Sequence, residues 1–415
     1  MKSIYLRMKT LKLYVTLVLI CCTTAGIAQT VTVDTLTIQS AVFNKARKIK
    51  VMLPFRYDQH PNTDEKYMVA YLFDSQSDDF FNIYKHTVNM LALQGILQPL
   101  ILIGIESGNR QFEFTAKAET EEGIKNYTKS GGADTLALHL KDEVISAIQK
   151  KYRTNGYNVG IGHSLGATFV TYALLKHPTL FGAAIAISPN YQYDKERMVD
   201  QFDKLGNTQL LNHKFLYIAH GYGDATEERF KPSTKKMESL LIKKNITGLR
   251  WEFKSMDNNS HATTALEGIF KGLIALNNQL NLSNEKIETF INDKRKPFIE
   301  NIKDHYKATS EWAGIKLPIV NQINNAGLGL LYSKRNKESI DMMTWGLSYY
   351  PHNINLYDSM AEIQNEMGDK QASLKYYTAG LNEVKNQKQT LDPKRYETLI
   401  AGYERHIQEV NKTIK

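Results

Sequence analysis

The sequence Gly162-His163-Ser164-Leu165-Gly166 lies between a short apolar stretch and a helical one. Residues 157–161 are predicted to form a buried strand, and residues 166–176 a helix that ends before Pro178. A G-x-S-x-G sequence at a strand-to-helix turn is typical of a nucleophile elbow, which holds the serine oxygen above the end of a sheet. The two glycines leave room for the tight turn. The sequence therefore predicts Ser164 as a catalytic nucleophile.

Two other interpretations of this stretch have to be weighed. In the first, the stretch is a glycine-rich turn in which Ser164 only caps the helix. In the second, it is a dinucleotide-binding loop, because Gly160 and Gly162 also follow a strand. That loop requires a third glycine where Leu165 stands and an acidic residue about 20 positions later. No Asp or Glu occurs between Ser164 and Tyr193, so we set the dinucleotide loop aside.

Segments typical of strands and helices alternate through the first two thirds of the chain. Residues 31–38 and 46–53 alternate apolar and polar side chains, which predicts an antiparallel start to a sheet. Further strands are predicted at 67–73, 100–105, 157–161, 181–187, 215–219 and 249–253, and helices at 78–94, 133–151, 166–176 and 264–280. This order predicts an α/β fold with a mostly parallel sheet covered by helices on both faces.

The character of the sequence changes after residue 282. Residues 283–322 are highly charged and predict a helical connector, and residues 323–415 are expected to be helical throughout. Residues 339–347 align with 373–381, an offset of 34 residues, which is the period of tetratricopeptide repeats. We therefore predict a small all-α domain of this type after an α/β domain at 29–282; the alternative is an ordinary helical hairpin.

The first 28 residues predict a secretory signal peptide. Basic residues precede an apolar run at 13–22, and small residues lead up to a cleavage position after Ala28. A lipoprotein signal at Cys21 or Cys22 is disfavoured, because neither follows the small residue that lipidation requires. The mature chain is thus expected to be exported, periplasmic or secreted, and to be free of disulfides, since both cysteines lie in the signal.

Composition and motifs exclude several classes of protein. The net charge of +9 over 415 residues is mild, and no basic block interleaved with aromatic residues predicts a nucleic-acid partner. Beyond the signal, no apolar run is long enough to span a membrane. The sequence contains no H-E-x-x-H and no phosphate-binding G-x-x-x-x-G-K. We expect neither a metal nor another cofactor.

His261 is the histidine that best fits the base of a serine hydrolase. The serine needs a base, the base needs an orienting carboxylate, and enzymes with this elbow carry them in the order Ser, acid, His. His261 follows the last predicted strand of the sheet. The acid should follow the strand at 215–219, where Asp224 comes first. Glu227 and Glu228 are alternative acids that could instead cap the next helix.

The remaining parts of the predicted site bind the oxyanion and the substrate. The backbone N–H of Leu165, directly after the nucleophile, is one expected oxyanion donor, and that of Gln76, after the strand at 67–73, is the other. The alternative for Gln76 is a plain turn. Arg110 and Tyr191 are expected to lie near the substrate pocket.

Several motifs along the chain carry a resemblance to a known family. They are Leu53-Pro54 with Tyr57, Tyr71 to Ser75, Ile103-Gly104-Ile105 with Arg110 and Phe114-Thr115, the elbow itself, and Phe181 to Asn190. With these residues the chain resembles the esterase family of α/β-hydrolases that includes esterase D, feruloyl esterases and ferric-siderophore esterases. The resemblance implies an α/β-hydrolase fold and an ester substrate. Ser75 replaces the family's glycine, and Asn258-Asn259-Ser260 stands where the family has a glutamate before its histidine.

Together these patterns predict an exported serine carboxylic-ester hydrolase. It would act on a small-molecule ester through a triad of Ser164, His261 and Asp224 and an acyl-enzyme. One alternative is a catalytically inactive hydrolase fold that binds a protein partner through the helical repeats. Another is an acyltransferase, which would use the same triad but exclude water.

Overall fold

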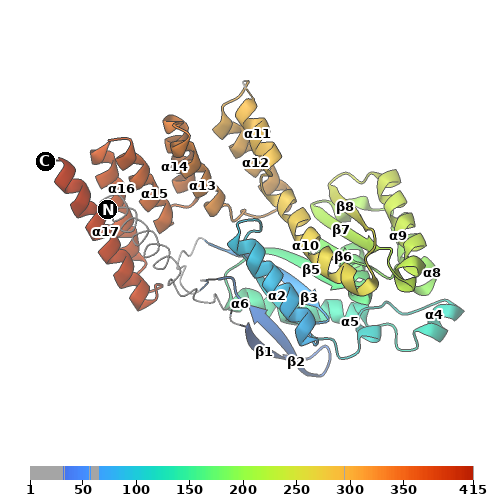
Figure 1. Ribbon diagram of the computed structural model, residues 1–415. Helices are drawn as coiled ribbons and strands as arrows, with labels where there is room; N and C mark the ends of the chain where they lie inside the picture. The colour runs from blue at the N-terminus through green and yellow to red at the C-terminus, as the bar shows by residue number, and fades with distance from the viewer. Residues whose placement is uncertain (1–30, 32, 56, 58–64, 294, 415) are drawn as a thin grey trace, which may run out of the picture. The chain divides into compact units, whose positions relative to one another are not determined.

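The computed structural model describes residues 31, 33–55, 57, 65–293 and 295–414 (Figure 1). The predicted signal peptide, with its cleavage position, lies outside the described residues. The described residues from Val33 onward belong to one compact unit.

One sheet of eight strands, ordered β1-β2-β4-β3-β5-β6-β7-β8, carries the first part of this unit. The strands are β1 (Val33–Ser40), β2 (Lys45–Met52), β3 (Tyr67–Phe73), β4 (Leu100–Ile105), β5 (Thr154–His163), β6 (Ala183–Ile187), β7 (Lys214–Gly221) and β8 (Leu249–Met256). β2 pairs antiparallel with both β1 and β4, and every other pair is parallel. The predicted antiparallel start and the mostly parallel sheet are thereby confirmed.

The central strands are buried on both faces. Every residue of β3, β4 and β6 is buried, as expected of parallel strands that lie between layers of helices. Since parallel strands end at the same edge of a sheet, the segments that follow β3, β5, β6, β7 and β8 meet there. This edge is where the predicted site residues belong.

Helices connect and cover the strands (Figure 1). The longer ones are α2 (Asp78–Leu93), α7 (Leu165–Lys176), α8 (Tyr193–Asp203), α9 (Ala225–Lys244) and α10 (His261–Leu280), and the short ones are α3 (Arg110–Glu113), α4 (Glu121–Asn126) and η3 (Thr208–Leu211). The helix predicted at 133–151 is instead α5 (Ala133–His139) and α6 (Ser146–Lys151) joined by a π-helical turn, η2 (Leu140–Ile145). Beside this turn, the buried His139 Nδ1 lies 2.5 Å from Glu143 Oε2.

α10 begins earlier than predicted. The expected start was residue 264, but Ser260 caps the helix, so that His261 is its first residue. The Ser260 and Thr263 side chains each bond the other's backbone N–H, which forms a capping box. This cap fixes the position of the His261 backbone at the edge of the sheet.

The rest of the chain is helical, as predicted. The predicted connector contains α11 (Asn284–Asn292) and α12 (Phe298–Ala313), and it is followed by α13 (Val320–Tyr332), α14 (Asn336–Tyr349), α15 (Ile354–Glu366), α16 (Lys370–Asn386) and α17 (Pro393–Ile414). Gly346 and Gly380 occupy matching positions of the 34-residue offset. An added Cβ would meet Ile323 at 2.6 Å in the first case and Tyr403 at 2.4 Å in the second. Both glycines thus permit close helix contacts, although the tetratricopeptide assignment itself stays a prediction.

Trp312 at the end of α12 contacts the segments that lead into β7 and β8. Its indole Nε1 donates to the Gly248 carbonyl at 3.2 Å, and its own carbonyl lies 2.8 Å from His213 Nδ1. The Arg250 guanidinium stands over the indole ring, 3.8 Å from its centroid. In the part of the chain that the structure describes, no helix is long and apolar enough to cross a membrane.

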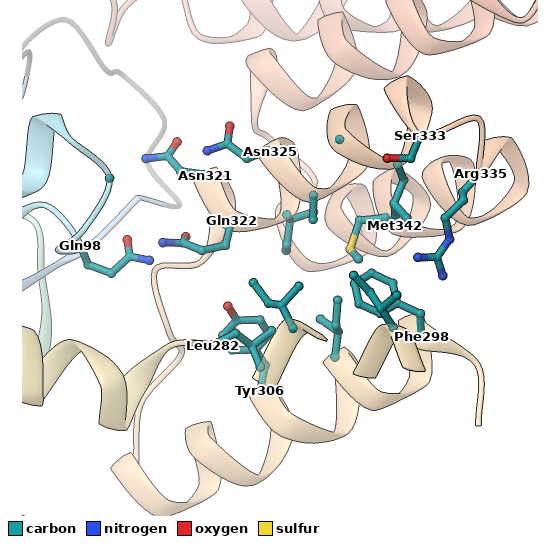
Figure 2. A pocket seen from close by; sticks show the side chains of 18 of the residues that line it. Gln98, Leu282, Phe298, Tyr306, Asn321, Gln322, Asn325, Ser333, Arg335 and Met342 are labelled. Carbon is teal, nitrogen blue, oxygen red and sulfur yellow. The ribbon is translucent and has the colours of Figure 1, made fainter. Parts of the chain in front are cut away.

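A cavity of about 540 Å³ lies between α12, α13 and the loop that carries Gln98 (Figure 2). Apolar and aromatic side chains such as Phe298 and Met342 line one end, and the amides of Gln98, Asn321 and Gln322 gather at the other. None of the predicted catalytic residues lines it.

His305, on α12, makes the stability of the fold dependent on pH. Burial, reinforced by the charges of Lys286 and Arg250, lowers the pKa of His305 to about 4 from its ordinary value of 6.5. As the pH falls from 6.5 toward 4, the unfolded chain therefore binds a proton that the folded chain does not. The free energy of unfolding is therefore unaffected by this group above pH 6.5, and it decreases as the pH falls from 6.5 to about 4.

We accordingly expect the melting temperature to fall by less in His305→Gln than in the wild type when the pH is lowered from 7 to 5. Thermal unfolding followed by circular dichroism at several pH values measures this slope. His86 is exposed on α2, so His86→Gln serves as the matched control. An unchanged slope in His305→Gln would show that this group does not contribute to the pH dependence.

Candidate active site

Ser164 occupies a strained turn between β5 and α7. Its φ of 59° and ψ of −121° lie outside the regions usual for non-glycine residues. The turn is fixed by hydrogen bonds, from Ser164 N to Ile187 O at 3.0 Å and from Thr168 N to Ser164 O at 3.1 Å. A Cβ on Gly162 would lie 2.2 Å from the Gly166 carbonyl group. The predicted elbow is thus present, and the chain requires glycine at that position.

The ring of His261 is held by a buried carboxylate. His261 Nδ1 lies 2.7 Å from Glu227 Oε1 and 3.0 Å from Ser188 Oγ. The Ser188 hydroxyl donates to the same Glu227 oxygen, so the serine offers Nδ1 a lone pair. Nδ1 therefore carries the hydrogen, which leaves Nε2 free to accept a proton as a general base.

Glu227 itself is completely buried and surrounded by donors. Its second oxygen accepts from Gly221 N at 2.9 Å and lies 2.9 Å from Nδ1 of the buried His220. Burial alone would raise the pKa of Glu227, but the contacts with His220, His261, Ser188 and Gly221 hold it well below its usual range. The side chain is therefore a carboxylate at neutral pH.

Asp224 was predicted to orient the His261 ring, and the structure corrects this prediction. Asp224 is the N-cap of α9, where its Oδ1 accepts from Thr226 N and Glu227 N at 2.9 Å each. Its other oxygen accepts from the backbone N of His261 at 2.7 Å. The side chain that caps the helix thus contacts the backbone of His261, while Glu227, in the first turn of α9, reaches the ring.

Glu228, the other alternative acid, points elsewhere. It is exposed, and its carboxylate lies 3.5 Å from Lys231 Nζ one turn along α9. Adjacent positions on a helix project in different directions, so Glu227 and Glu228 cannot both face the sheet. The alternative in which Glu227 or Glu228 caps the helix does not hold, because the N-cap is Asp224.

His163 contributes to the site in a way that the sequence did not predict. Its Nε2 lies 2.8 Å from the His261 carbonyl oxygen, to which it donates, and the two rings lie 4.4 Å apart between centroids. Burial and the neighbouring His261 lower the pKa of His163 to about 4. His163 is therefore neutral at physiological pH. Its hydrogen bond holds the backbone of the residue that bears the base.

No hydrogen bond joins the Ser164 hydroxyl to the His261 ring within the described residues. Contacts of this kind are often long in proteins without substrate and tighten when substrate binds. The elbow and the base do lie together, because His163, next to the nucleophile, contacts both the carbonyl and the ring of His261.

The two predicted oxyanion donors lie at the expected places in the fold. Leu165 is the first residue of α7, whose initial N–H groups have no partner within the helix. Gln76 follows β3, and among the described residues its backbone N–H donates to no protein acceptor. Its side-chain amide donates a hydrogen bond to Asp74 Oδ1 at 3.0 Å and accepts one from Ser107 N at 3.1 Å. The loop is thus held by specific contacts and is more than a simple turn.

Arg110 and Tyr191, the expected pocket residues, have different environments. Arg110 is half-exposed and binds both oxygens of Asp74, at 3.0 and 2.9 Å. Asp74 Oδ2 would lie 3.5 Å from a Cβ on Gly166, so this pair is close to the elbow. Tyr191 is fully buried and its hydroxyl lies 2.8 Å from Thr171 Oγ1. The Tyr191 side chain therefore packs inside the protein, and its place near the substrate pocket stays a prediction.

Comparison with known proteins identifies the family to which the chain belongs. The family model described as "Putative esterase" matches residues 40–261, a segment that extends from the end of β1 to His261. The chain belongs to this esterase family. It is a carboxylic ester hydrolase with an α/β-hydrolase fold.

Individual relatives of the esterase are distant in sequence. It is 23% identical over 215 residues to the ferri-bacillibactin esterase BesA of Bacillus subtilis (strain 168), covering 47% of this chain and 73% of that one. An IroE-like serine hydrolase from Shewanella oneidensis has a TM-score of 0.60 and 19% identity, covering 85% of this chain and 99% of its own. An uncharacterised protein from Capnocytophaga ochracea has the same TM-score at 17% identity, covering 90% and 99%.

The last two matches cover 85% and 90% of the esterase. The part that carries the sheet ends with α10 at Leu280, so each match must also include some of the helices that follow it. The structural similarity to these two proteins therefore extends into the helical region.

Among the described residues, no group of three or more His, Cys, Asp or Glu side chains is placed to hold a metal ion.

Proposed function

We propose that the esterase works through Ser164, His261 and Glu227 and forms an acyl-enzyme. Ser164 Oγ attacks the ester carbonyl while His261 Nε2 takes its proton, and the same proton is then given to the leaving alcohol. Water, activated by His261 in turn, releases the acid. The observation that supports this assignment is the 2.7 Å contact between His261 Nδ1 and a buried, ionised Glu227.

Glu227 replaces Asp224 in this proposal, and each of the two carboxylates has its own task. Glu227 keeps the His261 ring in the tautomer that exposes Nε2 and stabilises the imidazolium that forms during attack. Asp224 fixes the backbone of His261. Leu165 and Gln76 would supply the N–H groups that bind the oxyanion.

The substrate and the location of the enzyme are further parts of the proposal. The apolar run and small residues that end at Ala28 support export. A relative is named as a ferri-bacillibactin esterase, which makes siderophore esters the first class of natural substrate to test. Product analysis with an added alcohol acceptor would separate hydrolysis from acyl transfer.

Labelling with a fluorophosphonate probe tests the nucleophile directly, because the probe bonds covalently only to an activated serine. We expect the wild type to be labelled at Ser164 and Ser164→Ala to remain unlabelled. Ser239→Ala is the matched control, since Ser239 is exposed on α9 and only bonds the Lys235 carbonyl. If Ser164→Ala were labelled as strongly as the wild type, Ser164 would not be the nucleophile.

A further inference from the structure

A cavity of about 500 Å³ lies beside the candidate base. Phe230 lines it, and the edge of that ring meets the His261 ring with centroids 5.6 Å apart and planes at 85°. Asn190 also lines it and stands two residues after Ser188, which contacts both His261 and Glu227. A group held in this cavity against Phe230 would therefore be separated from the His261 ring by a single aromatic side chain.

The lining of this cavity is polar and carries an acceptor without a partner. Asn190 is only 5% exposed, and its Nδ2 donates to the Tyr127 hydroxyl at 2.8 Å. Its Oδ1 is buried and has no hydrogen-bond partner among the described residues. A buried acceptor left unpaired is unfavourable. This oxygen is thus placed to accept from an N–H or O–H of a bound molecule.

The charges around the cavity are balanced. Lys195 and Arg229 line it together with Glu122 and Asp194, two cations with two carboxylates. Such a lining carries no net charge and so offers no net attraction to a strongly charged group of either sign. The occupant that fits is a neutral group with hydrogen-bond donors, one face of which rests against Phe230.

One wall of the cavity is built from strained backbone. Asp194, Lys195 and Glu196 have φ angles of 51°, 54° and 63°, so three successive non-glycine residues are left-handed. Each residue in this conformation costs about 1–2 kcal/mol. Such strain persists only where surrounding contacts over-determine it, and it is concentrated at sites that bind ligands.

The contacts that hold this wall converge on the Asp194 carboxylate, whose side chain is fully buried. Oδ1 accepts from Thr120 N at 2.9 Å and from Thr120 Oγ1 at 2.7 Å, and Oδ2 accepts from Glu119 N at 3.0 Å. Arg197 Nη1 lies 3.6 Å from Oδ2. A Cβ on Gly123 would lie 2.2 Å from Oδ1. Asp194 therefore joins the start of α8 to the start of α4 across this wall.

We propose that this cavity binds a bulky, neutral acyl group that bears an amide N–H or a hydroxyl, and that Asp194 is the positioning residue that sets its shape. The proposal rests on the proposed function, because it concerns the substrate of that site. Asp194 does not touch the reacting atoms. Its loss is expected to affect only esters whose acyl group fills the cavity.

Two esters with the same leaving group separate this role from catalysis. p-Nitrophenyl acetate is too small to fill the cavity, whereas N-acetyl-L-phenylalanine p-nitrophenyl ester presents an amide N–H and a bulky ring. We expect Asp194→Asn to raise KM for the larger ester about tenfold, the size of one lost buried contact. Its kcat/KM for the acetate should stay within about twofold of the wild type. Asp200→Asn, at a half-exposed position on α8 that pairs with Lys236, is the matched control.

Thr120→Val provides a second variant that keeps the Asp194 carboxylate, since it removes the hydroxyl that donates to Asp194 and caps α4 by accepting from Gly123 N. It keeps the test informative if Asp194→Asn does not fold, and it should change KM in the same direction. Equal effects on both esters, or an unchanged KM for the larger ester in both variants, would overturn the role of Asp194. Turnover of both esters that survives in Ser164→Ala would instead overturn the proposed function.

Discussion

Replacing Glu227 by glutamine should lower kcat by about 10³- to 10⁴-fold, the scale seen when the acid of a serine triad becomes an amide. Glutamine keeps the size of the side chain but removes the charge that stabilises the His261 imidazolium. Its amide can also donate to Nδ1, which would favour the tautomer with a hydrogen on Nε2. Initial rates with p-nitrophenyl butyrate, measured beside Ser164→Ala to define the background, give the ratio.

Asp224→Asn is the matched comparison for Glu227→Gln. Asp224 holds the backbone N of His261 and caps α9, and asparagine is an equally good N-cap residue, so Asp224→Asn should reduce stability by less than about 1 kcal/mol. Its effect on kcat should be at least tenfold smaller than that of Glu227→Gln, because the carboxylate that faces the ring is still present. If Asp224→Asn instead caused the larger loss of kcat, the triad first inferred from the sequence would be restored.

Replacing Glu113 by alanine should cost about 3–5 kcal/mol of unfolding free energy, because it leaves a buried cation unpaired. Arg47 and Glu113 have side chains only 4% and 2% exposed and are joined by two hydrogen bonds, at 2.9 and 2.7 Å. Glu113 Oε1 also accepts from Gly108 N at 2.9 Å. The change would therefore release both β2 and the loop after β4. Urea unfolding followed by tryptophan fluorescence measures the loss.

An exposed pair on α9 gives the control for this prediction. Glu238 lies 3.0 Å from Lys235, and both side chains are partly exposed to solvent. Glu238→Ala is expected to change the unfolding free energy by no more than about 1 kcal/mol. Losses of similar size in Glu113→Ala and Glu238→Ala would contradict the view that burial makes the Arg47 pair essential to the fold.

The sheet could be predicted because its signals are local and redundant. Apolar runs such as 67–73 and 100–105 are short, uninterrupted and bounded by polar turns, which is typical of parallel strands buried on both faces. The elbow could be predicted for a similar reason, since a Cβ at position 162 would lie 2.2 Å from the Gly166 carbonyl group, so the turn requires glycine there.

The acid of the site could not be chosen from the sequence, because the choice depends on the direction of α9. Asp224 and Glu227 are three residues apart in one turn, and each is chemically able to orient a histidine. Once Asp224 caps the helix, its side chain lies over the first N–H groups, and Glu227 is turned toward the sheet. Nothing local distinguishes that arrangement from the reverse. The burial of Tyr191 likewise involves a contact with Thr171, which lies 20 residues earlier on α7.

The hydrogen bond from His163 to the His261 carbonyl has a consequence for how the site assembles. It links residues 98 positions apart in the sequence, and the elbow belongs to a central strand whereas the base follows the edge strand β8. Contacts of such long range form late, because the intervening chain must first be ordered. A chain in which β8 has not yet joined the sheet would hold the nucleophile without its base, so esterase activity should arise only as that last strand pairs with β7.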